Sequence, residues 1–224
     1  MSDPAAMSTE EASARVVRAL LDYRSIWTTH DLVEFSQVPT PAVRAILNTL
    51  EAETLIDRRR GGIVAVPDWP FLLSWWATTA PLAATNKTSY WQTTGTIRRL
   101  FGHIAATSTK HALSGVHAAG FSTASTPDLE PVIYTPDAQA AATAWALAPV
   151  ETDEPASRRD RVVLIETTTD VVYLRRRGSS SGVRVAAPTQ VLADLSQADA
   201  TPEEEAAAKR LLAWMQAHEL TWRY

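Results

Sequence analysis

The stretch WTTHDLVEFSQVPTPAVRAILNTLEAETLI, from Trp27 to Ile56, decides the fold of the N-terminal part of the chain. It contains two helix starts. Thr28 precedes a short helix as its N-cap, with Asp31 three residues on, and Thr40 is expected to cap the next helix with Pro41 at its first position. That second helix is marked by apolar residues at i, i+3, i+4 and i+7, namely Val43, Ile46, Leu47 and Leu50. The stretch therefore predicts two helices joined by a tight turn.

A further helix is expected before this stretch and a β-hairpin after it. The helix is indicated by an apolar stripe made of Val16, Val17, Leu20, Leu21 and Tyr23. The hairpin is indicated by two β-prone runs, Leu55–Arg59 and Ile63–Val66, on either side of the pair Gly61-Gly62. Three helices and a hairpin, in this order, describe a winged helix-turn-helix.

Residues 27–56 resemble the winged helix-turn-helix superfamily nearly position by position. One departure is Gln37, because members of the superfamily often have glycine in the turn between the second and third helices. Gln37 therefore has to adopt a backbone conformation that glycine takes more easily, or the turn has to differ slightly from that of the superfamily.

The resemblance to a winged helix predicts how this part of the chain would bind double-stranded DNA. The third helix of such a domain enters the major groove, and the hairpin, or wing, reaches the backbone or the minor groove. On the face opposite the apolar stripe, Arg44 can pair with guanine and Asn48 with adenine. Three arginines fall on the wing. The expected DNA-binding residues are Thr40, Arg44, Asn48, Arg58, Arg59 and Arg60.

Composition restricts the class of protein. The 224 residues are 46% hydrophobic and 21% charged, which is the ordinary balance of a globular chain. The net charge is −4, and residues 1–70 contain 7 basic and 10 acidic side chains, so any contact with nucleic acid must come from local clusters. Two such clusters are Arg58–Arg60 and Arg175–Arg177. The place of the second cluster in the chain favours no specific role, and it is either a solvated surface or an auxiliary phosphate contact.

Location is predicted from what the sequence lacks. No apolar run reaches the ~18 residues needed to cross a bilayer, and the acidic N-terminal residues contain no signal-peptide core. The absence of cysteine excludes disulfides, thiolate metal sites and cysteine nucleophiles. We therefore expect a cytoplasmic protein with no membrane partner.

The proline-rich segment Pro67–Pro70 predicts a boundary between two domains, residues 1–70 and 71–224. The tryptophan-rich segment Phe71–Trp76 is expected to be a short helix that packs the two domains together, with a partner surface as the alternative. Residues 77–95 are predicted to be loop. Strands are expected at 131–134, 161–166, 171–175 and 183–186, and helices at 97–104, 112–120, 137–147, 188–195 and from 201 onward. The predicted fold class is thus α+β, a winged helix-turn-helix followed by a mixed α/β domain.

Catalytic motifs are missing from this second half. No G-x-S-x-G, Walker or H-E-x-x-H motif occurs, and His111 and His117, six residues apart, make a poor metal pair on a helix. The Gly178–Gly182 turn resembles the one that opens a nucleotidyltransferase site, but Asp194 and Asp199 do not form the required D-x-D pair. We therefore expect no enzymatic activity, no catalytic residues, no metal site and no cofactor.

Two segments of the second half resemble the AbiEi family of type IV antitoxins. His111–Gly120 followed by Val132–Thr135 is similar to the helix and strand that open the C-terminal domain of that family, and Ala187–Leu195 with the acidic start Glu203–Glu205 is similar to its closing segment. The family places this domain after a winged helix. The resemblance implies an autorepressor that binds an operator in its own promoter and counters a nucleotidyltransferase-like toxin, without requiring a stable complex with it, in phage defence.

Three alternatives remain open from the sequence. The chain would be a one-component regulator if its C-terminal domain senses a small molecule, or an enzyme if the winged helix only targets it to DNA. The acidic balance of residues 1–70 also allows a winged helix that contacts proteins alone. The oligomeric state is not indicated by any feature of the sequence.

Overall fold

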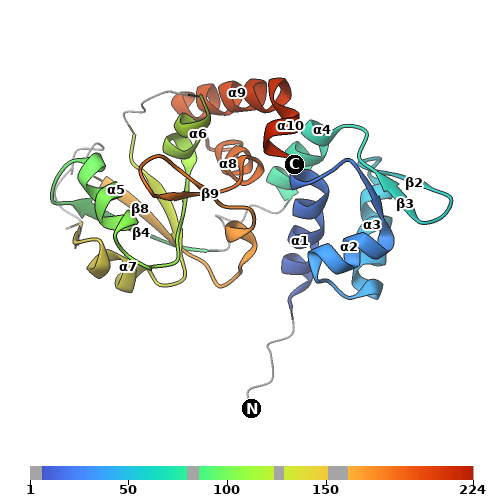
Figure 1. Ribbon diagram of the computed structural model, residues 1–224, viewed down its shortest axis with the longest axis horizontal. Coiled ribbons are helices and arrows are strands. Elements are labelled where there is room, and N and C mark those ends of the chain that lie inside the picture. Colours follow the sequence, from blue (N-terminus) through green and yellow to red (C-terminus); the bar gives the residue numbers. More distant parts are fainter. Residues whose placement is uncertain (1–6, 80–85, 124–128, 151–160, 224) are drawn as a thin grey trace, which may run out of the picture. The chain divides into compact units, whose positions relative to one another are not determined.

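Both helices and strands occur throughout the described residues, which confirms the expected mixed α+β class. The structure, a computed structural model, describes residues 7–79, 86–123, 129–150 and 161–223 (Figure 1). By their internal contacts the residues form two units, Met1–Ala80 with Glu219–Tyr224, and Pro81–His218. Residues 71–79, beyond the expected domain boundary at residue 70, therefore group with the first unit.

The first unit contains the three helices and the hairpin that the sequence predicts, and the helix predicted at Phe71–Trp76, together with a short strand and a C-terminal helix that it does not predict. Its elements are α1 (Thr9–Asp22), β1 (Ile26–Thr28), α2 (Thr29–Ser36), α3 (Thr40–Ala52), β2 (Asp57–Arg59), β3 (Ile63–Ala65), α4 (Trp69–Thr79) and α10 (Glu219–Trp222). Helix α1 contacts α2, α3 and α4, and α2 contacts α3 (Figure 1). The core between them is apolar and includes the fully buried side chains of Val16, Leu20, Leu32, Val43, Leu47, Leu50 and Leu72.

Local signals place the ends of the helices in this unit, with one error. The Thr28 hydroxyl accepts a hydrogen bond from the backbone N–H of Asp31 at 3.1 Å, which confirms it as the N-cap of α2. Thr40 is not a cap. Pro39 occupies the N-cap position with an extended backbone (φ −56°, ψ 142°), so that Thr40 is already helical and Pro41 follows it. Gln37 takes a left-handed conformation (φ 57°) after α2, as its place in the turn predicts.

A three-stranded antiparallel sheet in the order β1-β3-β2 completes this part of the first unit. The β2–β3 hairpin pairs Arg59 with Ile63, and both Gly61 and Gly62 have positive φ in its turn. The backbone N–H and the hydroxyl of Thr29 donate to the carbonyl of Gly62 at 2.9 and 3.1 Å. The hairpin turn is thereby tied to the first residue of α2.

The C-terminal segment of the chain belongs to the core of the first unit. Trp222 and Arg223 are each 1% exposed, and the ring of Trp222 lies 5.1 Å from that of Trp69 on α4. Arg223 donates to the carbonyl of Leu20 at 3.0 Å and to the Ser25 hydroxyl at 2.8 Å. Residues near position 220 therefore stabilise a unit that otherwise consists of residues before 81.

The second unit is built on a mixed seven-stranded sheet in the order β7-β4-β8-β6-β5-β10-β9. Pairs β6–β8 and β5–β10 are parallel, and the other neighbours are antiparallel. The strands are β4 (Lys87–Thr93), β5 (Ala112–Ser114), β6 (Val132–Thr135), β7 (Leu147–Pro149), β8 (Arg161–Glu166), β9 (Arg177–Gly178) and β10 (Arg184–Val185). The interior strand β8 has four consecutive buried residues, as expected for a strand covered on both faces.

Helices cover this sheet. They are α5 (Ile97–Ala105), α6 (Gly115–Thr123), α7 (Ala138–Ala144), α8 (Pro188–Leu195) and α9 (Pro202–Ala217), with a 3₁₀ turn, η1 (Val171–Tyr173), after β8. Helices α6, α8 and α9 pack against one another, whereas α7 packs on β7 and β8 (Figure 1). Helix α9 begins with a capping box in which Thr201 and Glu204 exchange hydrogen bonds, which confirms the predicted start.

Several expectations for the second unit are wrong, and each error concerns pairing between distant segments. Residues 87–93, within a predicted loop, form β4 because they pair with β8 and β7. The helix expected at 112–120 begins as strand β5, and α6 continues past Gly120. The alanine-rich helix ends at Ala144, before strand β7. The strand expected at 171–175 is the 3₁₀ turn η1.

Among the described residues, no helix is both long enough and apolar enough to span a bilayer.

Candidate nucleic-acid interface

The outer face of α3 carries the residues that the sequence selects for base contacts. Thr40, Arg44 and Asn48 are four residues apart and therefore lie in one stripe along the helix, and all three are exposed. The opposite face is held in the core by Val43 and Leu47, both 0% exposed. Burial of that face thus fixes the rotation of α3 and turns the stripe outward.

The hairpin meets this stripe at Asn48. The guanidinium of Arg58 donates from Nη1 to Oδ1 of Asn48 at 2.5 Å and lies 3.3 Å from Oε2 of Glu51. Asn48 and Glu51 are on α3, one helical turn apart, and Arg58 is in the middle of β2. The structure therefore brings together one predicted base-contacting residue and one predicted backbone-contacting residue.

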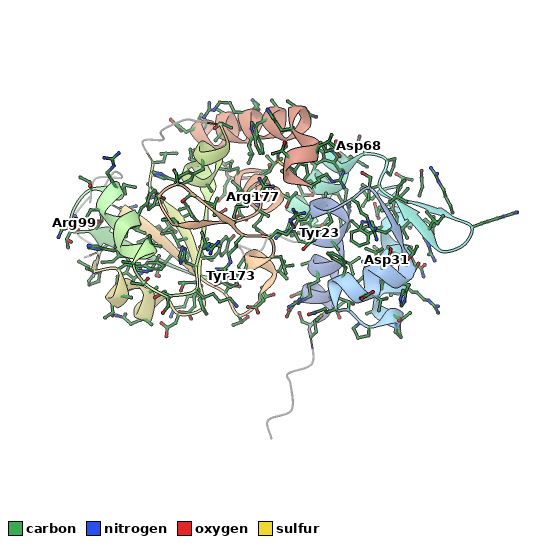
Figure 2. The ribbon with its side chains drawn as sticks, in the orientation of Figure 1. Tyr23, Asp31, Asp68, Arg99, Tyr173 and Arg177 are labelled. Atoms are coloured by element: carbon green, nitrogen blue, oxygen red, sulfur yellow. The ribbon has the colours of Figure 1, made fainter. Side chains whose placement is uncertain are left out.

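The other two arginines of the hairpin are turned away from this contact. Arg59 follows Arg58 on the strand and so points to the other face, and Arg60 begins the turn. Both are exposed, and neither forms a hydrogen bond or ion pair with another described residue. Figure 2 shows long side chains with nitrogen ends projecting from the β2–β3 hairpin. Their charges are available to a ligand.

Acidic side chains lower the positive charge of this surface. Glu51 pairs with Arg58, and Glu53 and Asp57 are exposed nearby in sequence. On α2, Asp31 pairs with Arg24 at 2.5 Å, and the guanidinium of Arg24 lies 4.3 Å from the ring centre of Trp27. Charge alone would therefore give weak attraction to a polyanion, and any DNA binding has to use the geometry of a few groups.

The contact between Asn48 and Arg58 determines which hydrogen-bonding groups are available. Because Oδ1 of Asn48 accepts from Arg58, the two Nδ2 donors remain for acceptors at a base edge, such as purine N7. Arg58 uses Nη1 in this contact and keeps other N–H donors for a phosphate oxygen. Base and backbone contacts would therefore be coupled through one hydrogen bond.

Two residues that position this interface were missed by the sequence reasoning. Glu51 could have been found, because its spacing of three from Asn48 places it on the same face of the helix. The bonds of Thr29 to Gly62 depend on a contact between residues 33 apart. No local signal identifies the second of these roles.

The chain matches no known protein-family model, no curated protein and no solved structure.

The second unit contains its own polar cluster, centred on Asp194 of α8. The carboxylate of Asp194 accepts hydrogen bonds from Ser114 Oγ at 2.5 Å, Tyr134 Oη at 3.0 Å and Gln190 Nε2 at 2.8 Å. It lines a cavity of about 260 Å³ together with Tyr90. Because its oxygens are already held by neutral donors, Asp194 is placed to fix β5, β6 and α8 relative to one another.

The two histidines that were weighed as a metal pair have separate roles. His111 precedes β5 and contacts the backbone of Thr109 and Arg184, whereas His117 on α6 contacts the carbonyl of Leu129 at 2.6 Å. Burial lowers the pKa of both imidazoles. Among the described residues, no group of three His, Asp or Glu side chains converges on a point where a metal ion would fit.

Proposed function

We propose that the first unit is a winged helix-turn-helix domain that binds double-stranded DNA and that the protein is a transcriptional repressor. The observation that carries this proposal is the hydrogen bond between Asn48 on α3 and Arg58 on β2. It joins the outward stripe of the third helix to the hairpin, which are the two parts of a winged helix that contact DNA. The exposed side chains of Arg44, Arg59 and Arg60 supply the remaining donors.

The proposed division of roles follows from the geometry. Thr40, Arg44 and Asn48 lie where a major-groove helix presents its base contacts. Arg58, Arg59 and Arg60 lie on the hairpin, where they contact phosphates or enter the minor groove. The acidic side chains around them make general attraction weak, so binding depends on a matching sequence.

The test of DNA binding is fluorescence anisotropy with a labelled fragment of the protein's own promoter and a scrambled fragment of equal length. Sequence-specific binding is expected, with the promoter fragment bound at least about tenfold more tightly than the scrambled one. Equal, weak binding of both fragments at physiological salt would instead favour a winged helix that contacts proteins.

The resemblance of residues 111–135 and 187–205 to AbiEi antitoxins extends the proposal to a type IV toxin–antitoxin system. In this proposal the protein represses its own promoter and counters a nucleotidyltransferase-like toxin encoded beside it. The double variant Arg44→Ala, Asn48→Ala separates the two activities. It should lose repression of a promoter fusion while still restoring growth to cells that express the neighbouring toxin, and failure of the wild-type chain to restore growth would remove the antitoxin assignment.

A further inference from the structure

Cationic side chains lie around Tyr173 in the second unit, which contains none of the proposed DNA-binding residues. Tyr173 ends η1 and is labelled in Figure 2. The Nζ of Lys110 lies 4.5 Å from the centre of its ring, and the guanidinium carbon of Arg176 lies 5.0 Å from it. Arg176 belongs to the triplet Arg175–Arg177, for which the sequence allows a solvated surface or an auxiliary phosphate contact.

His111 holds two arginines of this group next to each other. Its carbonyl accepts from Nη1 of Arg176 at 2.5 Å, and its Nε2 accepts from the backbone N–H of Arg184 at 3.0 Å. Since Nε2 is an acceptor, the ring proton is on Nδ1, which lies 2.8 Å from the carbonyl of Thr109. Pairing of β9 with β10, with Gly178 opposite Arg184, keeps the two segments in register. The fold thus sets the guanidinium of Arg176 and the backbone of Arg184.

Acidic groups balance the positive charge of these arginines only in part, because the charge of Asp170 also acts on Arg176. Asp170 pairs with Lys110 at 2.5 Å, but no carboxylate among the described residues forms an ion pair with Arg176 or Arg184. Arg176 is partly buried, and burial lowers its pKa, with the charge of Arg184 acting in the same direction. Two guanidinium groups that form no ion pair with a described carboxylate favour the binding of an anion.

A buried hydrogen-bond donor lies within the same group. Tyr173 is only 8% exposed, and its hydroxyl has no hydrogen-bond partner among the described residues. Burial raises the pKa of Tyr173, so the hydroxyl keeps its proton at neutral pH. The guanidinium of Arg176 lies over the same ring, with its carbon 5.0 Å from the ring centre. A buried donor without an acceptor is costly, and an anion oxygen would satisfy it.

We infer that Tyr173, Arg176 and Arg184 form a binding site for the phosphate group of a phosphomonoester, a ligand that neither the DNA interface nor the resemblance assigns. Arg184 is exposed and supplies the outer donors, Arg176 supplies the inner ones, and the Tyr173 hydroxyl donates at the most buried point. Lys110 contributes positive charge at the rim. The second unit would in this way respond to a phosphorylated small molecule independently of DNA.

A terminal phosphate fits these groups better than a phosphodiester of nucleic acid. A monoester presents three free oxygens and up to two negative charges, which match one phenol donor and the remaining N–H donors of two guanidinium groups. A diester has two free oxygens, one charge and a substituent on each side, so it cannot bring three oxygens to a donor set that includes a buried hydroxyl. The same phosphate chemistry is offered by inorganic phosphate and by nucleoside monophosphates.

The test is isothermal titration calorimetry of the full-length protein with inorganic phosphate, with AMP, with 3′,5′-cyclic AMP and with a short DNA duplex. Four proteins are compared: the wild type, Tyr173→Phe, Arg184→Ala and Arg210→Ala. The phenylalanine variant keeps the ring and removes only the hydroxyl. Arg210 is an exposed arginine on α9 and controls for the loss of one positive charge from the same unit. Melting curves of all four establish that they fold.

Saturable binding of phosphate or AMP is expected, with no binding of the cyclic diester. Affinity should fall about tenfold or more in Tyr173→Phe and in Arg184→Ala, since each loses a hydrogen bond to a charged group, and should be unchanged in Arg210→Ala. Binding of phosphate but not AMP would identify the free ion as the ligand. The inference is overturned if no monoester binds at millimolar concentration, if Arg210→Ala weakens binding equally, or if only the DNA duplex depends on Tyr173 and Arg184.

Discussion

Arg58 donates a hydrogen bond from Nη1 to Oδ1 of Asn48 at 2.5 Å, and so connects the β2–β3 hairpin to the outward face of α3. The same Nη1 lies 3.3 Å from a carboxylate oxygen of Glu51. The carboxylate of Glu51 partly neutralises the charge of Arg58, and this weakens the attraction of Arg58 for a DNA phosphate. The balance between Glu51 and phosphate therefore governs how strongly this surface attracts DNA.

Replacement of Glu51 by glutamine should increase DNA affinity. The change removes one negative charge beside the phosphates and frees Arg58, which is worth about 0.5–1 kcal/mol at an exposed site and so gives about a two- to fivefold tighter complex. Because the effect is electrostatic, operator and scrambled DNA should gain equally in anisotropy titrations. Glu53→Gln is the matched control and should have a smaller effect, since no ion pair of Glu53 occurs among the described residues. An unchanged affinity in Glu51→Gln would show that Arg58 does not contact DNA.

Base contacts and wing contacts should respond differently to mutation. Arg44→Ala or Asn48→Ala should cost about 1–3 kcal/mol on the operator and little on scrambled DNA. The triple alanine variant of Arg58, Arg59 and Arg60 should weaken both complexes and lower the slope of log K against log salt by up to roughly 2.7, or about 0.9 for each phosphate contact. Salt titrations by anisotropy measure both quantities, and slopes that stay the same in the triple variant would exclude phosphate contacts by the hairpin.

Gln37→Gly should stabilise the first unit. Gln37 has a φ of 57°, a left-handed conformation that costs a residue with a side chain roughly 1–2 kcal/mol relative to glycine. Because glycine also gains entropy in the unfolded chain, the net increase in the free energy of unfolding should be about 0.5–1 kcal/mol. Urea denaturation followed by circular dichroism measures it. Glu34→Gly, in the exposed part of α2, should instead destabilise by about 1 kcal/mol.

Residues 219–223 should be required for the stability of the first unit. Trp222 is 1% exposed and packs against Trp69, so Trp222→Ala should lower the free energy of unfolding by about 3–5 kcal/mol. Leu220→Ala is the control in the same short helix, because Leu220 is 78% exposed and its removal should change stability by no more than about 0.5 kcal/mol. Calorimetry compares the variants, and equal melting curves for both would show that α10 is not part of the folded core.

Acidification should destabilise the second unit. Burial lowers the pKa of His111 and of His117 from the ordinary value of 6.5, with Arg176 and Arg184 adding to the effect at His111. Below about pH 6.5 the unfolded chain takes up protons that the folded chain does not. The contribution of these histidines to the free energy of unfolding is therefore at its maximum above that pH and decreases as the pH falls below it.

The steepest loss for two such histidines is about 2.7 kcal/mol per pH unit. Urea titrations between pH 7.5 and 5, values that bracket the unfolded pKa of about 6.5, measure the slope. The double variant His111→Gln, His117→Gln should flatten it. A slope that remains equally steep in the double variant would assign the pH dependence to other groups.

Local sequence patterns predict much of the structure of the first unit. The spacing of Val43, Leu47 and Leu50 predicts which face of α3 is buried, and this alone turns Arg44 and Asn48 outward, because a helix repeats every 3.6 residues. Capping residues predict where α2 and α9 begin, at Thr28 and Thr201, because the hydrogen-bonded groups are only three residues apart. These features need no distant partner, and the sequence determined them by itself.

Other features depend on segments that meet only in the folded chain. Strand β4 reads as a loop because its partners in β7 and β8 lie more than 50 residues away, and η1 has the composition of a strand but no strand to pair with. The hydrogen bond between Arg58 and Asn48 depends on the register of the hairpin, and the burial of Arg223 depends on a carbonyl 203 residues earlier. Only the tertiary structure decided these features, because long-range hydrogen bonds and packing leave no periodic signal in the residues that form them.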